Sequence, residues 1–142
     1  MKKRNLIVLV LISMLFLTAQ ITIAKDMTAK DLVGDAKKNI CEVSVSEAKA
    51  LLDKDGYIFV DCRTSKEFKM GHVPGAMNIP RGLLEFKIDK KIPDKATEIV
   101  MYCKKGSRGC LATCTLCRMG YKNTKNMDGG WKAWEKAGYP VE

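Results

Sequence analysis

The chain has 142 residues, of which 25 are basic and 16 acidic, so its formal net charge at pH 7 is +9. This length argues against a second domain and suffices for one domain whose hydrophobic core needs no disulfides. The lysines are scattered among Asp and Glu instead of being grouped with aromatic residues, which argues against nucleic-acid binding and favours small anionic substrates.

The first 24 residues have the pattern of a secretory signal peptide. Three basic residues precede an apolar stretch from Leu6 to Leu17, and the small-residue pattern Thr22-Ile23-Ala24 follows. Cleavage after Ala24 removes those three basic residues and leaves 22 against 16 acidic ones, a net charge of +6. We expect export to the bacterial periplasm or an equivalent space. The alternative is an uncleaved anchor, because the stretch extended to Ile23 is marginally able to span about 30 Å of hydrocarbon.

Residues 25–40 are rich in lysine and form a predicted helical lead-in, with a helix from Ala29 to about Lys38. The domain proper is predicted over residues 41–142. Ser44 or Ser46 can cap its first helix, which runs to about Asp53. Gly56 prevents the helix from continuing.

Two short, continuously apolar runs, 57–60 and 99–102, are typical of strands that are buried on both faces of a parallel sheet. Shorter strands are predicted near 76–79 and 123–127. Further helices are predicted near 65–70, 81–86, 107–119 and 130–137. This alternation of strands and helices predicts an α/β fold with an open parallel sheet flanked by helices on both faces.

The loop after the 99–102 strand contains the best candidate for a nucleophile. Cys103 lies between the end of a strand and the start of a helix, where unpaired N–H groups and the helix dipole favour a thiolate. Lys104, Lys105 and Arg108 add positive charge, so we expect a lowered pKa for Cys103. Gly106 allows the loop amides to curl inward into an anion-binding nest. Cys103 as an inert buried side chain is the alternative.

The chain resembles the single-domain rhodanese family over nearly all of its length after the signal. The matching motifs, in order, are Phe59-Val60-Asp61-Cys62-Arg63, Glu67-Phe68, the segment from Gly71-His72-Val73-Pro74-Gly75 to Pro80, the Cys103–Arg108 loop and Gly129-Gly130-Trp131-Lys132-Ala133-Trp134.

This resemblance implies a five-stranded parallel sheet and a sulfurtransferase that works without a cofactor. Cys103 accepts a sulfane sulfur from a small anionic donor such as thiosulfate and passes it from a persulfide to cyanide, a thiol or a protein acceptor. The loop from Lys104 through Lys105 and Gly106 to Arg108 binds the donor. Ser107 is predicted to cap the following helix and to hydrogen-bond into the nest.

Loop length separates this chemistry from that of a cysteine-dependent phosphatase, which needs five residues between its Cys and Arg. Here only four residues separate Cys103 from Arg108. No Asp or Glu lies near the loop in sequence to act as a general acid.

Other marked residues have a structural interpretation beside the functional one. We expect His72 to order the turn before the 76–79 strand, with a catalytic role as the alternative. Asp61, Arg63 and Glu67 are interpreted as structural ion pairs and hydrogen bonds, with an acid/base or anion-binding role as the alternative. The two tryptophans of the last helix, Trp131 and Trp134, are expected in the core.

The chain departs from the family pattern at Cys62, Cys110, Cys114 and Cys117. The family's second and fourth strands are neighbours, so Cys62 can be a redox partner of Cys103; a small core residue is the alternative. Cys110, Cys114 and Cys117 share one stripe of a helix, from which a soft-metal site, sulfur relay, core packing or pairing with Cys41 all remain open. Our prediction is no metal. The alternative to an enzyme is a non-catalytic sulfur carrier or thiol-redox module that acts with a protein partner.

Overall fold

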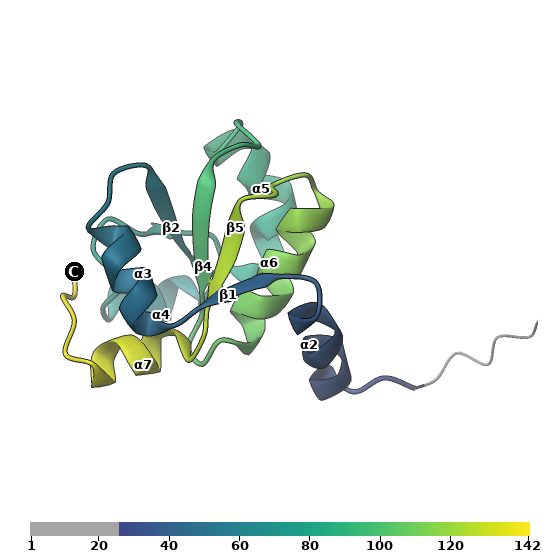
Figure 1. Ribbon diagram of the computed structural model, residues 1–142, viewed down its shortest axis with the longest axis horizontal. Coiled ribbons are helices and arrows are strands. Elements are labelled where there is room, and N and C mark those ends of the chain that lie inside the picture. Colours follow the sequence, from purple (N-terminus) through teal and green to yellow (C-terminus); the bar gives the residue numbers. More distant parts are fainter. Residues whose placement is uncertain (1–25) are drawn as a thin grey trace, which may run out of the picture.

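The computed structural model describes residues 26–142, so the predicted signal peptide lies outside the described residues. Along the described part of the chain, no helix is long and apolar enough to cross a membrane. A parallel sheet with the strand order β1-β5-β4-β2-β3 forms the centre of the molecule (Figure 1). Its strands are β1 (Cys41–Val43), β2 (Tyr57–Asp61), β3 (Met77–Asn78), β4 (Glu98–Tyr102) and β5 (Thr124–Met127).

Helices lie on both faces of this sheet, as Figure 1 shows, so the predicted open five-stranded α/β fold is confirmed. They are α2 (Ala29–Lys37), α3 (Val45–Leu52), α4 (Ser65–Lys69), the 3-10 turn η1 (Arg81–Leu83), α5 (Leu84–Lys91), α6 (Ser107–Arg118) and α7 (Gly130–Lys136).

The predicted ranges agree with these elements to within about two residues, with two exceptions. The strand β1 had no predicted range, because it is a three-residue edge strand with little burial. The helix predicted over residues 81–86 begins as η1 and continues as α5 to Lys91, because Leu84 and Ile88 bury one face of it. Ile92, which precedes a proline, leaves the helical conformation and ends the helix.

Side-chain caps explain where two of the helices begin. Ser44 and Glu47 form a reciprocal capping box at the start of α3, which selects Ser44 over Ser46 as the cap. Thr64 and Glu67 form the same arrangement at the start of α4. The second box also fixes the position of the Glu67 carboxylate, which contacts Arg108 of α6.

The alternating side chains of β2 and β4 divide the core into two layers. On one face, Val60 and Met101 pack against α5 and α6; on the other, Phe59 and Val100 pack against α3 and α7. By the same alternation Cys62 and Cys103, which follow the two strands, belong to the α5/α6 layer.

The helix α2 confirms the helix predicted in the lead-in. It packs against α6, and the Cys110 thiol of α6 donates a long hydrogen bond to the Val33 carbonyl oxygen of α2 at 3.6 Å. Ala36 is its buried residue.

Candidate active site

Two cysteines lie side by side where the central strands end. Asp61 of β2 is aligned with Tyr102 of β4, so the next residues along the two strands, Cys62 and Cys103, are neighbours. The Cys62 N–H donates to the Tyr102 carbonyl oxygen at 2.9 Å, which continues the ladder to this point. Both side chains are buried in the same layer, and the Cys62 thiol donates a hydrogen bond to the Cys103 sulfur.

The Cys103 sulfur is surrounded by hydrogen-bond donors. The Cys62 thiol is the most effective of them, and the backbone N–H groups of Gly109, Lys105 and Gly106 also donate to the sulfur. Together they outweigh the effect of burial and lower the pKa of Cys103 to about 5. The opposite holds for Cys62, whose pKa is raised by its hydrogen bond to Cys103 and by burial. At neutral pH the pair is therefore a Cys103 thiolate beside a Cys62 thiol.

The start of α7 holds the loop in the conformation that turns these amides inward. The Trp131 N–H donates to the Cys103 carbonyl oxygen at 2.7 Å, and the Lys132 N–H donates to the Lys104 carbonyl oxygen at 3.0 Å. With the carbonyls drawn toward α7, the N–H groups of the loop are left to face the sulfur. Gly130 makes this close approach possible, because a Cβ there would lie 2.3 Å from the Cys103 carbonyl oxygen.

The prediction that Ser107 caps α6 is wrong. Gly106 occupies the N-cap position, with a φ of 97°, and no side chain caps the helix; Ser107 is its exposed first residue. The third N–H of the helix, that of Gly109, donates to the Cys103 sulfur instead. The thiolate thus takes the place of the usual capping oxygen.

Arg108 is not a free cation at the loop. Its guanidinium donates to the Glu67 carboxylate at 3.1 and 3.3 Å, and this pairing lowers the pKa of Glu67 to about 2. Sequence interpretation assigned Glu67 to a structural ion pair; the pair exists, but its partner belongs to the active-site loop. The pairing could not be predicted from the loop sequence, because Glu67 lies 41 residues before Arg108.

A pocket of about 200 Å³ lies beside the loop. Lys104 and Lys132 supply exposed cations at its wall, whereas Lys105 is exposed and does not line it. Two larger hollows, of about 460 and 390 Å³, lie along α2, but neither includes a residue of the Cys103–Arg108 loop. The residues of the smaller pocket are Arg63, Glu67, Met70, Lys104, Trp131, Lys132 and Glu135.

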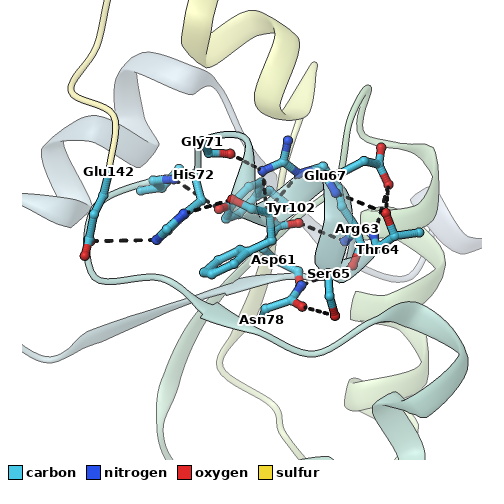
Figure 2. A network of polar contacts seen from close by, with 12 residues as sticks. Asp61, Arg63, Thr64, Ser65, Glu67, Gly71, His72, Asn78, Tyr102 and Glu142 are labelled. Atoms are coloured by element: carbon cyan, nitrogen blue, oxygen red, sulfur yellow. Dashed lines mark hydrogen bonds and ion pairs between the residues drawn. The ribbon is translucent and has the colours of Figure 1, made fainter.

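The buried ion pair of Asp61 and Arg63, drawn in Figure 2, joins the end of β2 to the turn at Gly71. The two side chains are 2.7 Å apart, and the Arg63 guanidinium also donates to the Gly71 carbonyl oxygen at 2.7 Å. Arg63 lies 4.6 Å from the centre of the Trp131 ring. The ion pair and hydrogen bonds expected of Asp61 and Arg63 are thus present, and Arg63 also lines the pocket.

His72 contacts the turn and the chain terminus. Its ring stacks on Phe68 and is hydrogen-bonded to the Phe68 carbonyl oxygen, and its backbone exchanges two hydrogen bonds with Glu142 (Figure 2). These contacts agree with the predicted role in ordering the turn. The tryptophans are core residues as predicted: Trp134 is fully buried and Trp131 is 7% exposed.

Cys110, Cys114 and Cys117 do share a helix, but they differ in burial. Cys110 is fully buried, which raises its pKa to about 11, and Cys114 and Cys117 are half-buried. All six cysteines lie in the described residues and are free thiols there, so no disulfide joins Cys41 to this stripe. No group of three or more metal-ligating side chains was found in residues 26–142.

The chain matches a protein-family model and several known proteins. The family model described as Rhodanese-like domain matches residues 44–137. Thiosulfate sulfurtransferase 18 of Arabidopsis thaliana is 31% identical over 116 residues, covering 73% of this chain and 85% of the relative. A sulfurtransferase of Allochromatium vinosum is 34% identical over 98 residues, covering 69% and 90%.

Among solved structures, a protein of unknown function from Rhodopseudomonas palustris, described as a possible tyrosine phosphatase, is 32% identical with a TM-score of 0.75. The match covers 87% of this chain and 99% of that protein.

Proposed function

Because the chain belongs to the rhodanese-like domain family, we propose that it is a thiosulfate-type sulfurtransferase with Cys103 as the nucleophile. The observation that carries the proposal is the set of N–H and S–H donors around a Cys103 sulfur whose pKa is about 5. A site that stabilises a thiolate also suits the negative charge of a persulfide. Relatives named as sulfurtransferases support the same reaction class.

In the proposed first half-reaction, the Cys103 thiolate attacks the outer sulfur of thiosulfate. The sulfur–sulfur bond of the donor breaks, sulfite leaves with the bonding electron pair, and Cys103 holds a persulfide. Lys104 and Lys132 at the pocket wall, together with Arg108 paired with the Glu67 carboxylate, attract the anionic donor to the loop, and the loop amides bind the persulfide. In the second half-reaction, cyanide or a thiolate attacks the outer sulfur and restores the Cys103 thiolate. No cofactor enters either step.

Phosphoryl transfer fits the site less well than sulfur transfer. Four residues separate Cys103 from Arg108, one fewer than a phosphate-binding loop of this type requires. Glu67 is the carboxylate that contacts the loop through Arg108, and with a pKa of about 2 it is ionised at neutral pH and is a poor general acid.

We also propose that the mature chain is exported. The signal-like first 24 residues suggest a periplasmic or equivalent location for the mature chain, with an uncleaved anchor as the alternative. Fractionation of cells that express the full chain, with intact mass of the product, distinguishes a released protein cut after Ala24 from a membrane-bound one.

The deciding experiment measures thiocyanate formation from thiosulfate and cyanide by the reduced protein, with intact mass recorded in parallel. Cys103→Ser is the control. Turnover that is lost in the variant supports the enzyme. Loading of one sulfur atom on Cys103 without turnover supports the alternative, a sulfur carrier or thiol-redox module that needs a protein partner. Full activity in Cys103→Ser would refute Cys103 as the nucleophile.

A further inference from the structure

The second thiol of the active site has the placement that a disulfide with Cys103 requires. Neighbouring strands of a sheet lie about 4.8 Å apart, which falls inside the range of roughly 4.4–6.8 Å between the Cα atoms of disulfide-bonded cysteines. Cys62 and Cys103 follow aligned residues of neighbouring strands and pack in the same layer. The two thiols are close enough for each to shift the pKa of the other. Of the six cysteines, all within the described residues, Cys62 is the one placed to react with Cys103.

The state of Cys103 controls whether Cys62 can act as a nucleophile. While Cys103 is a thiolate, its charge and the hydrogen bond between the two sulfurs hold the Cys62 proton in place. Loading Cys103 with a sulfane sulfur moves that negative charge outward by one atom. The inner sulfur of the persulfide then becomes an uncharged, electrophilic atom in direct contact with Cys62.

We infer that Cys62 resolves the Cys103 persulfide, forming a Cys62–Cys103 disulfide and expelling the outer sulfur as hydrosulfide. This inference rests on the proposed sulfur loading of Cys103. It adds a second activity, release of hydrosulfide from a sulfane sulfur donor, to the transfer of sulfur to an external acceptor.

The step balances without an external oxidant. The bond between the Cys103 sulfur and the outer sulfur breaks, and a bond between the Cys62 and Cys103 sulfurs forms. The electron pair of the broken bond leaves with the outer sulfur, which takes the Cys62 proton and departs as HS⁻. Cys62 is oxidised from thiol to disulfide and the outer sulfur is reduced to sulfide. The resulting disulfide must be reduced by an external dithiol before the next cycle.

The test uses Cys62→Ser, because a serine hydroxyl still donates a hydrogen bond to the Cys103 thiolate but cannot form a disulfide. Cys114→Ser, which removes a half-buried thiol from α6, is the matched control. Each reduced full chain is loaded with thiosulfate in the absence of cyanide and thiol, and freed of excess donor. Hydrosulfide is measured over time, and acid-quenched samples are analysed by intact mass and peptide mapping.

Unmodified protein and Cys114→Ser should first gain one sulfur atom, then lose it together with two hydrogen atoms, and release one equivalent of hydrosulfide. Peptide mapping should place the new disulfide between Cys62 and Cys103, and dithiothreitol should restore loading. Cys62→Ser should keep its added sulfur and release hydrosulfide at least about tenfold more slowly.

Other outcomes overturn the inference in distinguishable ways. A loaded sulfur equally persistent in unmodified protein and Cys62→Ser would refute resolution by Cys62 while leaving the sulfurtransferase proposal intact. A disulfide that maps to cysteines other than this pair would also refute it. Failure of every form to gain sulfur would remove the proposed function and the inference together.

Discussion

Glu67 of α4 accepts two hydrogen bonds from Arg108 of α6, so the arginine of the Cys103–Arg108 loop is already paired with a carboxylate. The Glu67 carboxylate is held there by a second set of contacts, since it also accepts from the N–H and hydroxyl of Thr64. An anionic donor must therefore compete with a fixed carboxylate for Arg108. This competition makes donor affinity sensitive to the charge at position 67.

Glu67→Gln should lower the KM for thiosulfate by about three- to tenfold, because the glutamine leaves the full charge of Arg108 to the donor. Glutamine can still take part in the capping box of α4, so the fold should persist. Steady-state kinetics and thermal unfolding measure the two effects. Glu85→Gln, which removes an α5 carboxylate paired with Arg81 of η1, is the control and should leave the KM unchanged. A higher KM in Glu67→Gln would contradict the competition.

Arg108→Ala should raise the KM for thiosulfate much more than it lowers thermal stability, because Arg108 is partly exposed and an exposed ion pair adds about 1 kcal/mol or less to stability. Arg108→Lys should bind the donor more tightly than Arg108→Ala, since a lysine keeps the positive charge but lacks the two parallel N–H donors of a guanidinium. Donor-concentration curves for the two variants provide the measurement. An identical KM in Arg108→Ala and the unmodified protein would show that the donor does not use this side chain.

Alkylation of Cys103 by iodoacetamide should follow a titration with its midpoint near pH 5, because the donors around the sulfur favour the thiolate. The rate should fall below the midpoint and stay level from about pH 7 upward. Cys62→Val removes the strongest donor and should move the midpoint upward, whereas Cys62→Ser should stay closer to the original value.

Peptide mass spectrometry resolves this titration site by site. Cys110 provides an internal comparison, since its pKa of about 11 should keep it unreactive at neutral pH. A Cys103 midpoint that is the same with cysteine and with valine at position 62 would show that the hydrogen bond between the two sulfurs is unimportant.

Gly130→Ala should unfold the active-site loop or the whole domain, because its Cβ would meet the Cys103 carbonyl oxygen at 2.3 Å while φ is 57°. Gly138→Ala separates the two causes: Gly138 has a φ of 69°, but nothing lies within 4 Å of its Cβ position. We expect Gly130→Ala to cost at least about 2 kcal/mol more in the free energy of unfolding than Gly138→Ala. Urea denaturation gives both values, and equal losses would mean that close approach to the loop contributes nothing.

Much of the fold could be predicted because the relevant signals are local. Continuous apolar runs at 57–60 and 99–102 predict the two buried strands. Ser44 and Thr64 are each followed three positions later by Glu, which is the pattern of a capping box. The edge strand Cys41–Val43 has no such signal, since it is short and largely exposed. The cap of α6 was assigned wrongly because a thiolate, instead of a serine hydroxyl, accepts the helix N–H.

The sequence by itself determined the order of the helices and of every strand except β1, the presence of Cys103 between a strand and a helix, and the glycine that lets the loop curl. Only the tertiary structure decided which groups surround that cysteine. Parallel pairing of β2 with β4 places Cys62 against Cys103, and the turn into α4 brings Glu67 to Arg108. These contacts join residues about 40 positions apart, and they arise from sheet register and helix packing, which no local pattern of residues encodes.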